Sequence, residues 1–413
     1  MNNHDLLLNL FHAALAAAMP DGKFGPHLPP RPQGRTLVLG AGKGSACMAQ
    51  AFENEWGAPV EGLVVTRYGH ACPTQYVEIV EAAHPVPDET GLKTAARILA
   101  MAHSAGPDDL VIFLMSGGAS SLLSLPVAGV SFAEKQAVNR ALLQSGMPIG
   151  AMNKVRKSLS AIKGGRLAAA AARAQLVTFL ISDVPGDDPA AIGSGPTIAE
   201  PLSAADIFTS LHQYEVHISE TVRAAIKANC TAPLPAPRHA VHMLATPMMA
   251  LNAAAAQARA LGLLPVILSD CIEGEAREVA KVCAGIAMTQ RRQATLASKP
   301  MVLLSGGETT VTVRGKGRGG RNAEFLLALL QALGDMSGIA AIACDTDGID
   351  GIETNAGAWI DESLVRHPHA AELKIADYLA NNDAYSYFQA LNRLVITGPT
   401  LTNVNDFRAI LVR

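Results

Sequence analysis

The stretch TLVLGAGKGS, residues 36–45, runs from an apolar segment into a glycine-rich turn, and a segment of helical period follows at residues 46–56. This order of strand, turn and helix is the first half of a βαβ unit. Along the rest of the chain, short β-branched runs alternate with alanine- and leucine-rich segments of helical period. Such alternation is typical of a mostly parallel sheet covered by helices on both faces. The sequence therefore predicts an α/β fold.

The length of the chain indicates two domains. Its 413 residues, 49% of them hydrophobic, exceed what one ordinary core requires. Residues 231–238, TAPLPAPR, interrupt the pattern with three prolines, so we predict domains at residues 1–235 and 236–413. The strands are expected at residues 36–39, 62–66, 110–115, 176–182, 241–245, 264–269, 301–305, 310–314, 339–344 and 393–397.

Charge, cysteine usage and hydropathy exclude several classes of protein. The net charge is −3 and no dense Lys/Arg tail occurs, so a nucleic-acid partner is not expected. The six cysteines are scattered without metal-ligand spacing and indicate reduced thiols in a cytoplasmic protein. The apolar run at residues 110–115 is far shorter than the roughly 20 residues of a membrane span. Residues 1–19 indicate an amphipathic helix rather than a signal peptide.

The glycine-rich turn after the first strand is the first candidate site. Glycines let backbone N–H groups approach an anion, and the helix that follows adds its dipole. The turn lacks P-loop spacing, and it matches a dinucleotide fingerprint only in part, because Ser45 replaces the third glycine and no acid follows the next strand. The alternative is a strand-to-helix turn with Lys43 in solvent. The residues expected around a phosphate are Gly40, Gly42, Lys43, Gly44 and Ser45.

Two similar turns follow apolar strands, SGGASS at residues 116–121 and SGGETT at residues 305–310. Both expose several N–H and O–H donors, which suit phosphate or carboxylate oxygens. A covalent role for Ser116 is disfavoured because the GxSxG elbow is missing, and a plain structural turn is the alternative. The candidate oxyanion-binding residues are Ser116, Gly117, Gly118 and Ser120, together with Gly193, Ser194 and Gly195 of a later segment.

Three carboxylates follow another predicted strand, in the segment ISDVPGDDP. Asp183, Asp187 and Asp188 form a hard-oxygen group of the kind that holds Mg²⁺ on substrate phosphates. The alternative is that these residues only make turns and N-caps. For the three together we favour the magnesium site.

Two basic segments complete the candidate site. In the predicted helix 153–166, Arg156, Ser160 and Lys163 share one face beside the buried stripe, and the alternative is a solvated basic face. The loop 314–321 carries four cations among glycines. Its Arg321 stands at the entry to the next helix, where the guanidinium can bind a carboxylate or phosphoryl group. The alternative for this loop is a mobile surface segment.

In this order, the strings GAGKGS, AHPVPDE, SGGASSLL, KVRKSLSAIKGGRLA, ISDVPGDDPAAIGSGPT, LLSGGETTVTVRGKGRGGRNAE and DTDGIDG closely resemble the class II glycerate kinases, the glycerate 2-kinase family with a C-terminal MOFRL domain. The resemblance covers residues 6–413. It implies an N-terminal Rossmann-like domain, a smaller C-terminal α/β domain of MOFRL type and a cleft between them. It also implies transfer of the ATP γ-phosphoryl group to the 2-hydroxyl of D-glycerate with Mg²⁺, and functional roles for Lys43 and Arg321.

Phosphoryl transfer requires positioning and charge stabilisation, and the chain offers cations, oxygen ligands and amide-rich turns for both. We assign Lys43 and Arg321 to the transferring phosphoryl group and the glycerate carboxylate. Asp183, with Asp187 or Asp188, is expected to hold Mg²⁺ or to accept the hydroxyl proton. Further residues expected to bind substrate or nucleotide are Arg156, Lys163, Glu308, Asn322 and Asp345.

Two other functions stay open at this stage. A NAD(P)H-dependent hydroxypyruvate reductase, a name often given to relatives, would use the turn at Gly40 with Arg67 on a 2′-phosphate, but no His/acid pair is evident. A non-catalytic sugar-acid-binding regulator would not need so many acids beside basic loops. The sequence also leaves open the nucleotide preference, the domain that holds ATP, and the oligomeric state, with a homodimer among the alternatives.

Overall fold

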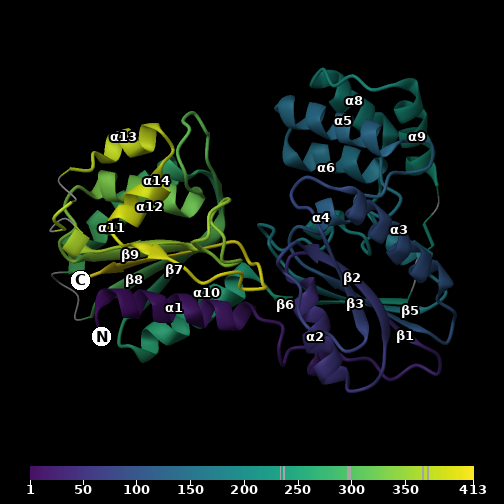
Figure 1. Ribbon diagram of the computed structural model, residues 1–413, viewed down its shortest axis with the longest axis horizontal. Coiled ribbons are helices and arrows are strands. Elements are labelled where there is room, and N and C mark those ends of the chain that lie inside the picture. Colours follow the sequence, from purple (N-terminus) through teal and green to yellow (C-terminus); the bar gives the residue numbers. More distant parts are fainter. Residues whose placement is uncertain (233, 236–237, 295–298, 365–366, 370–371) are drawn as a thin grey trace. The chain divides into compact units, whose positions relative to one another are not determined.

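The computed structural model describes residues 1–232, 234–235, 238–294, 299–364, 367–369 and 372–413. These residues form two compact units (Figure 1). The N-terminal unit contains residues 20–180 and 188–244, and the C-terminal unit contains residues 1–19, 181–187 and 245–413. Within the described ranges, no helix has both the length and the apolar character of a membrane span.

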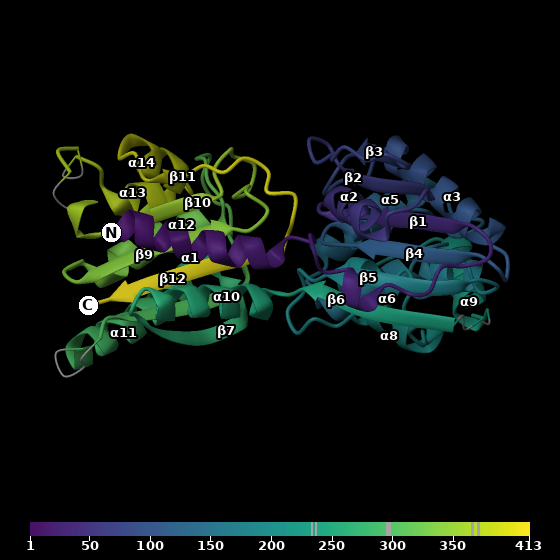
Figure 2. The same ribbon diagram turned by 90° about the horizontal axis from the view of Figure 1, so that it is seen from below.

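The N-terminal unit is built on a sheet with the strand order β3-β2-β1-β4-β5-β6 (Figure 2). Its strands are β1 (Thr36–Ala41), β2 (Glu61–Arg67), β3 (Val77–Ala82), β4 (Leu110–Met115), β5 (Gln175–Ile181) and β6 (Arg238–Ala245). β1 to β5 pair in parallel, and the order is that of a doubly wound dinucleotide-binding fold. Because the order reverses between β1 and β4, the turns after these two strands lie side by side at the edge where such folds bind ligands.

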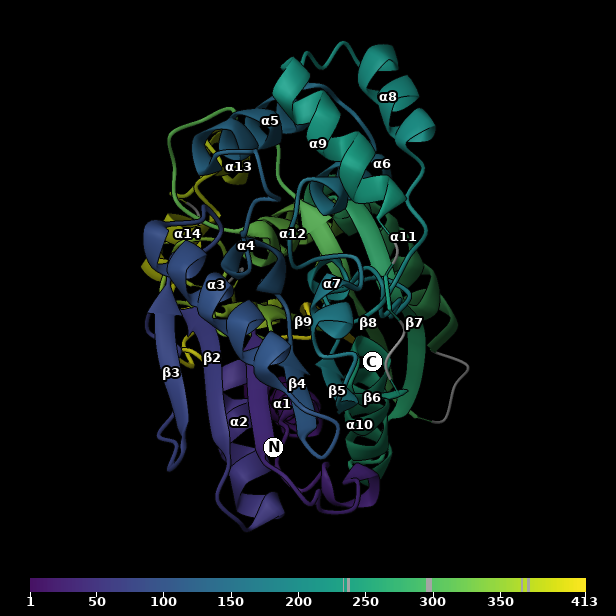
Figure 3. The same ribbon diagram turned by 90° about the vertical axis from the view of Figure 1, so that its right-hand side faces the viewer.

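Helices connect these strands and form an additional group beyond the sheet. They are α2 (Ser45–Trp56), α3 (Glu89–Ser104), α4 (Ala119–Leu122), α5 (Phe132–Gln144), α6 (Ile149–Ser158), α7 (Arg166–Ala170), α8 (Ala204–Gln213) and α9 (Glu220–Thr231), with 3-10 turns η1 (Gly25–His27) and η2 (Ile192–Ser194). α5, α6, α8 and α9 gather beyond the sheet (Figures 1 and 3). Leu142, Val155 and Ile226 lie in the apolar core of this group, which fixes α5 relative to its neighbours.

The C-terminal unit contains a mixed sheet with the order β11-β10-β9-β12-β8-β7. Its strands are β7 (Leu264–Glu275), β8 (Met301–Thr310), β9 (Ile339–Asp345), β10 (Gly357–Ile360), β11 (Leu394–Val395) and β12 (Asp406–Val412). β12 pairs antiparallel with both β8 and β9, whereas β7 and β8 are parallel. β12, which follows the other five strands in sequence, therefore lies inside the sheet, between β8 and β9.

Helices cover both faces of the C-terminal sheet. α1 (Asn3–Ala18) and α10 (Pro247–Ala260) lie on one face, and most of the others lie on the opposite face (Figure 1). The remaining helices are α11 (Ala276–Ala294), α12 (Arg321–Leu333), α13 (Ile375–Ala380) and α14 (Ala384–Ala390), with a 3-10 turn η3 (Glu362–Leu364). Phe325, Leu329 and Phe388 are buried in the core on this side, so α12 is held firmly with Arg321 at its first turn.

The α/β class and the mostly parallel N-terminal sheet are confirmed, but several predicted elements are wrong. The strand expected at residues 310–314 does not form, because the partner strand β7 ends at Glu275 opposite Thr310. The helix expected at residues 153–166 ends at Ser158, because Leu159 leaves the helical conformation and Ser160 forms an isolated β-bridge with Pro126. The strand expected at residues 393–397 is reduced to β11, and β3, β10 and β12 were not predicted.

The two units also divide the chain differently from the predicted ranges 1–235 and 236–413. α1 packs in the C-terminal unit although it lies at the start of the sequence, and β6 completes the sheet of the N-terminal unit. The proline-rich boundary segment 231–238 includes residues 233 and 236–237, which lie outside the described residues.

Candidate functional site

The turn after β1 packs directly on the turn after β4. Gly42 has a φ of 135°, and a Cβ atom there would lie 2.5 Å from the Ser116 carbonyl oxygen, so the close approach requires glycine. The N–H of Lys43 donates to the Gly117 carbonyl at 2.8 Å, and that of Gly44 donates to the Ser116 Oγ at 2.9 Å. The other N–H groups of this turn also donate within the protein. The N–H groups of this turn are therefore used within the protein and do not form the cradle that the sequence predicted.

Ser116, Ser45 and Gly40 were also predicted to bind an oxyanion, but in the structure they hold the ends of β1 and β4 together. Ser116 is fully buried, and its Oγ lies 3.3 Å from the Ser45 Oγ. The Ser45 hydroxyl also donates to the Leu114 carbonyl at 3.3 Å. A Cβ atom at Gly40 would lie 2.6 Å from the same carbonyl oxygen. Ser116 is thus a structural residue, which argues against a nucleophilic role.

A cavity of about 370 Å³ opens beside these turns. Its lining includes Gly118, Ser120, Arg156 and Lys163, all predicted to bind an anion. Lys163 is 3% exposed, and its Nζ donates to the Ser120 carbonyl at 2.6 Å and to the Ser120 Oγ at 3.1 Å. The Ser120 hydroxyl bonds that of Ser194, 74 residues further along the chain, at 2.8 Å. Separate sequence motifs therefore meet at one cavity.

The glycines on either side of Ser194 permit this meeting. Gly193 and Gly195 both have a φ of 57°, and a Cβ atom at Gly193 would lie 2.6 Å from the Met115 Sδ. The Gly165 N–H donates to the Gly195 carbonyl at 2.8 Å. These two glycines serve close packing rather than a phosphate cradle.

His84 is a cavity residue that the sequence analysis did not single out, although it lies in the quoted string AHPVPDE. A Cβ atom at Gly118 would lie 2.9 Å from the His84 Nε2 and 3.3 Å from the Lys43 Cγ. The Lys43 side chain therefore runs beside a glycine of the cavity wall. Among the described residues, the N–H groups of Gly117 and Gly118 have no acceptor. Gly117 and Gly118 are thus the part of the predicted cradle that still has free donors.

Three basic side chains act on the charge of Lys163. Burial lowers the pKa of Lys163 well below its ordinary value, and the charges of Lys135, Arg156 and Lys157 lower it further. Lys157 is paired with Glu200, but the described lining of the cavity contains no Asp or Glu. An anionic ligand would supply the missing charge and would favour the protonated form of Lys163.

Lys135 gives this group a measurable pH dependence. Its Nζ donates to the Leu125 carbonyl at 3.1 Å, and burial lowers its pKa from 10.5 to about 7. Between these two pH values the amine is neutral in the folded protein and protonated in the unfolded chain. The free energy of unfolding should therefore rise with pH in this window, by up to about 1.4 kcal/mol per pH unit from this one group.

Lys135→Met should remove this contribution, so the difference in unfolding free energy between wild type and variant should change with pH above about 7 in urea titrations. Lys154→Met, at an exposed position of α6, is the matched control and should run parallel to wild type. Parallel curves for Lys135→Met would show that the buried amine stays charged.

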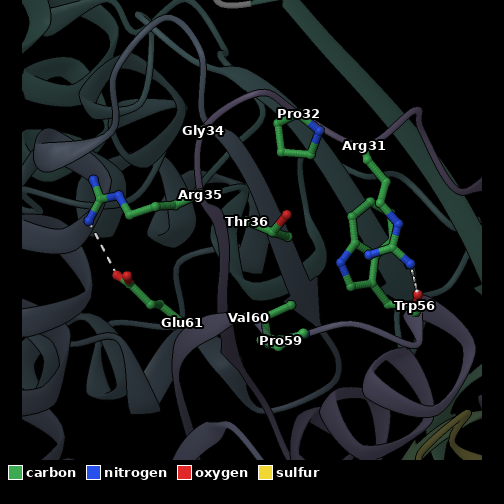
Figure 4. A pocket seen from close by; sticks show the side chains of 9 residues that line it. All are labelled: Arg31, Pro32, Gly34, Arg35, Thr36, Trp56, Pro59, Val60 and Glu61. Atoms are coloured by element: carbon green, nitrogen blue, oxygen red, sulfur yellow. Dashed lines mark hydrogen bonds and ion pairs between the residues drawn. The ribbon is translucent and has the colours of Figure 1, made fainter.

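A smaller cavity of about 280 Å³ lies at the opposite, amino edge of the N-terminal sheet (Figure 4). There Arg31 stacks on Trp56 with 4.6 Å between the guanidinium carbon and the ring centroid. Arg35 bonds Glu61 at 3.2 Å and Asp109 at 3.1 Å. The charged groups of this cavity are satisfied within the protein, and we assign no ligand to it.

In the C-terminal unit, Arg321 is held by three carboxylates. Its Nε donates to Asp406 at 2.7 Å, one Nη to Asp345 at 3.0 Å and the other to Glu308 at 3.1 Å. Burial alone would lower the pKa of Arg321, but Asp406, Asp345 and Glu308 outweigh it and hold the pKa well above its ordinary value. The guanidinium was predicted to bind an anionic ligand, whereas in the structure its first partners are the protein's own acids.

Asp406 is the centre of this network and was missed by sequence reasoning. Its fully buried carboxylate accepts hydrogen bonds from Arg321, from the Asn322 side chain at 2.8 Å and from the Thr309 N–H at 3.2 Å, and it pairs with buried Arg408. Burial alone would raise the pKa of Asp406, yet Arg408 and Arg321 hold it below its ordinary value. Asn322, predicted as a ligand-binding residue, is instead a buried part of this network.

Asp350 fixes the start of α12. Its carboxylate accepts the N–H groups of Asn322 at 2.9 Å and Ala323 at 2.8 Å, which satisfies donors of the first helical turn. Burial raises the pKa of Asp350 to about 6 although these two bonds oppose the shift. A Cβ atom at Gly320 would collide with this carboxylate, so the glycine before Arg321 is a steric requirement.

The three predicted magnesium ligands do not form one group. Asp183 and Asp187 lie in the C-terminal unit, whereas Asp188 is exposed, belongs to the N-terminal unit and accepts the Ala190 N–H at 2.9 Å. Asp187 has one buried carboxylate oxygen without a hydrogen-bond partner; burial and nearby Asp270 raise its pKa, while a bond from Ser182 lowers it. In the described part of the chain, no three His, Cys, Asp or Glu side chains are placed to hold a metal on their own.

The fold and the cavity together define the class of this protein. It is an α/β protein with a cationic cavity at the carboxyl edge of a doubly wound sheet. Residues 6–227 match the model of a domain of unknown function, DUF4147, and residues 301–406 match the MOFRL family. A Thermotoga maritima D-glycerate 2-kinase is 36% identical, over 97% of this chain and 96% of the kinase.

Two further proteins are similar to this one over nearly the whole chain. A protein of Agrobacterium vitis, provisionally named a hydroxypyruvate reductase, is 50% identical over 98% of this chain and 94% of that protein. The crystal structure of a Thermotoga maritima glycerate kinase has a TM-score of 0.89 and 36% identity, and covers 99% of both chains. The chain belongs to the glycerate 2-kinase family with a C-terminal MOFRL domain.

Proposed function

We propose that this protein is a glycerate 2-kinase, which transfers the γ-phosphoryl group of ATP to the 2-hydroxyl of D-glycerate. The observation that carries the proposal is the cavity that Arg156 and Lys163 line, with no carboxylate among its described lining residues. Phosphoryl transfer relies on positioned cations of this kind. Similarity to a named D-glycerate 2-kinase over nearly the whole chain supports the same reaction.

Lys43 and Arg321 are the cations that we assign to the reacting groups. Lys43 runs beside Gly118 of the cavity wall, and its ammonium would stabilise charge on the phosphoryl oxygens. Arg321 keeps 22% of its side chain exposed while three carboxylates orient it. Its remaining N–H groups would bind the glycerate carboxylate or a phosphoryl edge.

Magnesium fits the acids that follow β5. The buried Asp187 oxygen without a hydrogen-bond partner would be one hard-oxygen ligand, and Asp183 would supply a second carboxylate from the same unit. Mg²⁺ is commonly held by one or two carboxylates together with substrate phosphates, whose charge it neutralises. We therefore propose ATP and Mg²⁺ as cofactors, and the free thiols of the chain favour a cytoplasmic location.

The product identifies the reaction. The purified full chain is incubated with D-glycerate, ATP and Mg²⁺, and the product is given to enolase without phosphoglycerate mutase. Consumption by enolase is expected, because only the 2-phospho isomer is its substrate. A product that needs the mutase, or oxidation of NAD(P)H by hydroxypyruvate at a rate comparable to phosphoryl transfer, would contradict the proposal.

Activity should depend on a divalent cation. Excess EDTA should reduce turnover to background, and added Mg²⁺ should restore it, because the charge of ATP must be neutralised. Asp187→Asn should raise the Mg²⁺ concentration for half-maximal rate by at least about 10-fold, the scale on which metal sites lose affinity. Asp188→Asn, at an exposed carboxylate, should change it little. Full turnover in EDTA, or an effect of Asp188→Asn alone, would overturn this metal assignment.

A further inference from the structure

The cavity of the N-terminal unit has two chemically different ends. Lys163 and Ser120 form its buried, cationic end, joined by the hydrogen bonds described above. At its open end stand Val86, 70% exposed, and Leu143, 66% exposed. Large apolar side chains with such exposure belong to no core of the unit, and they line the cavity from two separate segments, the loop before α3 and helix α5.

A hydrogen bond connects helix α5, which carries Leu143, to the loop that carries Val86. The Gln136 side chain of α5 donates to the Pro87 carbonyl at 3.4 Å, which links the helix to the loop of Val86. Asn139 lines the cavity one helical turn before Leu143, on the same face of α5. The start of α5 is fixed by a capping box. The open end is therefore a preformed slot between two apolar side chains, with the Asn139 amide and the exposed Arg140 guanidinium also in its lining.

We infer that this cavity binds an adenine nucleotide, with the base between Val86 and Leu143 and the phosphates toward Arg156 and Lys163. A volume of about 370 Å³ lies in the range of pockets for ligands larger than a three-carbon acid. D-glycerate would match the cationic end but has no apolar surface for the slot. A nucleoside polyphosphate matches both ends, and Asn139 can hydrogen-bond a base edge. The inference rests on the proposed function for the choice of ATP, and it assigns the nucleotide to the N-terminal unit.

Two variants test the two ends separately. Isothermal titration measures the binding of ADP and of adenosine, which has no phosphate, to the full chain. Leu143→Asn should weaken both ligands by about 10-fold, equivalent to about 1.4 kcal/mol, because the base loses an apolar contact. Arg156→Gln should weaken ADP and leave adenosine unchanged. Val282→Asn, at an exposed apolar position of α11 outside the cavity, is the matched control and should bind both ligands like wild type.

Steady-state kinetics separate this inference from the proposed function. In Leu143→Asn, KM for ATP should rise while KM for glycerate stays within about twofold. A rise for glycerate alone, or unchanged ADP and adenosine binding in both variants, would overturn the nucleotide site even if the kinase is active. If ADP binds as expected but no phosphoglycerate forms, the proposed function fails and the site stands. Tighter, Leu143-dependent binding of NADPH than of ADP would contradict the choice of ATP.

Discussion

Arg321→Lys should lower kcat/KM for glycerate phosphorylation by roughly 10²-fold or more, the size of losing one preorganised contact to transition-state charge. Lysine keeps the charge, but a single ammonium cannot reproduce the fork that Asp406, Asp345 and Glu308 hold through three different nitrogens. If the guanidinium acts mainly in the transition state, kcat should fall in proportion. If it anchors the glycerate carboxylate throughout, KM for glycerate should rise while kcat holds.

Arg318→Lys is the control for this experiment, because Arg318 lies in the same glycine-rich loop and pairs with Glu353 at the surface. It should leave both kinetic constants near those of wild type. Wild-type constants in a normally folded Arg321→Lys protein would show that Arg321 serves only to hold its loop.

Asp406→Asn should lower the free energy of unfolding of the C-terminal unit by about 3–5 kcal/mol, because it leaves buried Arg408 without its countercharge. The substitution keeps the shape of the side chain, so the loss reports charge rather than packing. Urea denaturation followed by Trp359 fluorescence in a Trp56→Phe background measures this unit, since the chain contains two tryptophans. Replacing Arg408 by Met in the same variant should recover part of the stability.

The matched control is Glu278→Gln, which breaks an exposed ion pair with Lys281 in the same unit. Its cost should stay below about 1 kcal/mol, because solvent screens such pairs. A similarly small cost for Asp406→Asn would mean that water reaches Arg408 and that the network is not the electrostatic centre of the unit.

The inner strands β1, β4 and β5 of the N-terminal sheet were predictable because they are almost wholly buried, whereas the more exposed edge strand β3 was missed. The run at residues 110–115 is uninterrupted and apolar, and β4 has those bounds. β12 was missed for the opposite reason. Asp406 and Arg408 alternate with apolar residues and resemble the solvent face of an edge strand, yet they lie at the centre of a sheet. Only contacts with residues almost a hundred positions away, such as Thr309, make that placement favourable.

In the candidate site too, local sequence motifs predicted some features, and contacts between distant segments determined the others. Ser120, Lys163 and Ser194 were all chosen from local motifs, and the structure brings them together. What local motifs could not reveal is which donors are already used. The N–H groups of Lys43 and Gly44 are taken by the turn after β4, a contact set by the strand order and invisible in GAGKGS itself. Leu143 was overlooked because a single apolar residue in a sequence does not indicate a binding site until the residues that lie next to it in the fold are known.

Helix α1 makes the order of synthesis matter for this chain. Its apolar face, including Leu7 and Phe11, is buried in the C-terminal unit, where Phe11 contacts Phe407 of β12 with 5.6 Å between ring centroids. The ribosome makes α1 before the N-terminal unit and β12 after it. The N-terminal unit can fold as it emerges, while α1 can complete its packing only after α10, β9 and β12 have been released. Nascent chains stalled before residue 406 should therefore hold a folded N-terminal unit and a first helix accessible to chaperones.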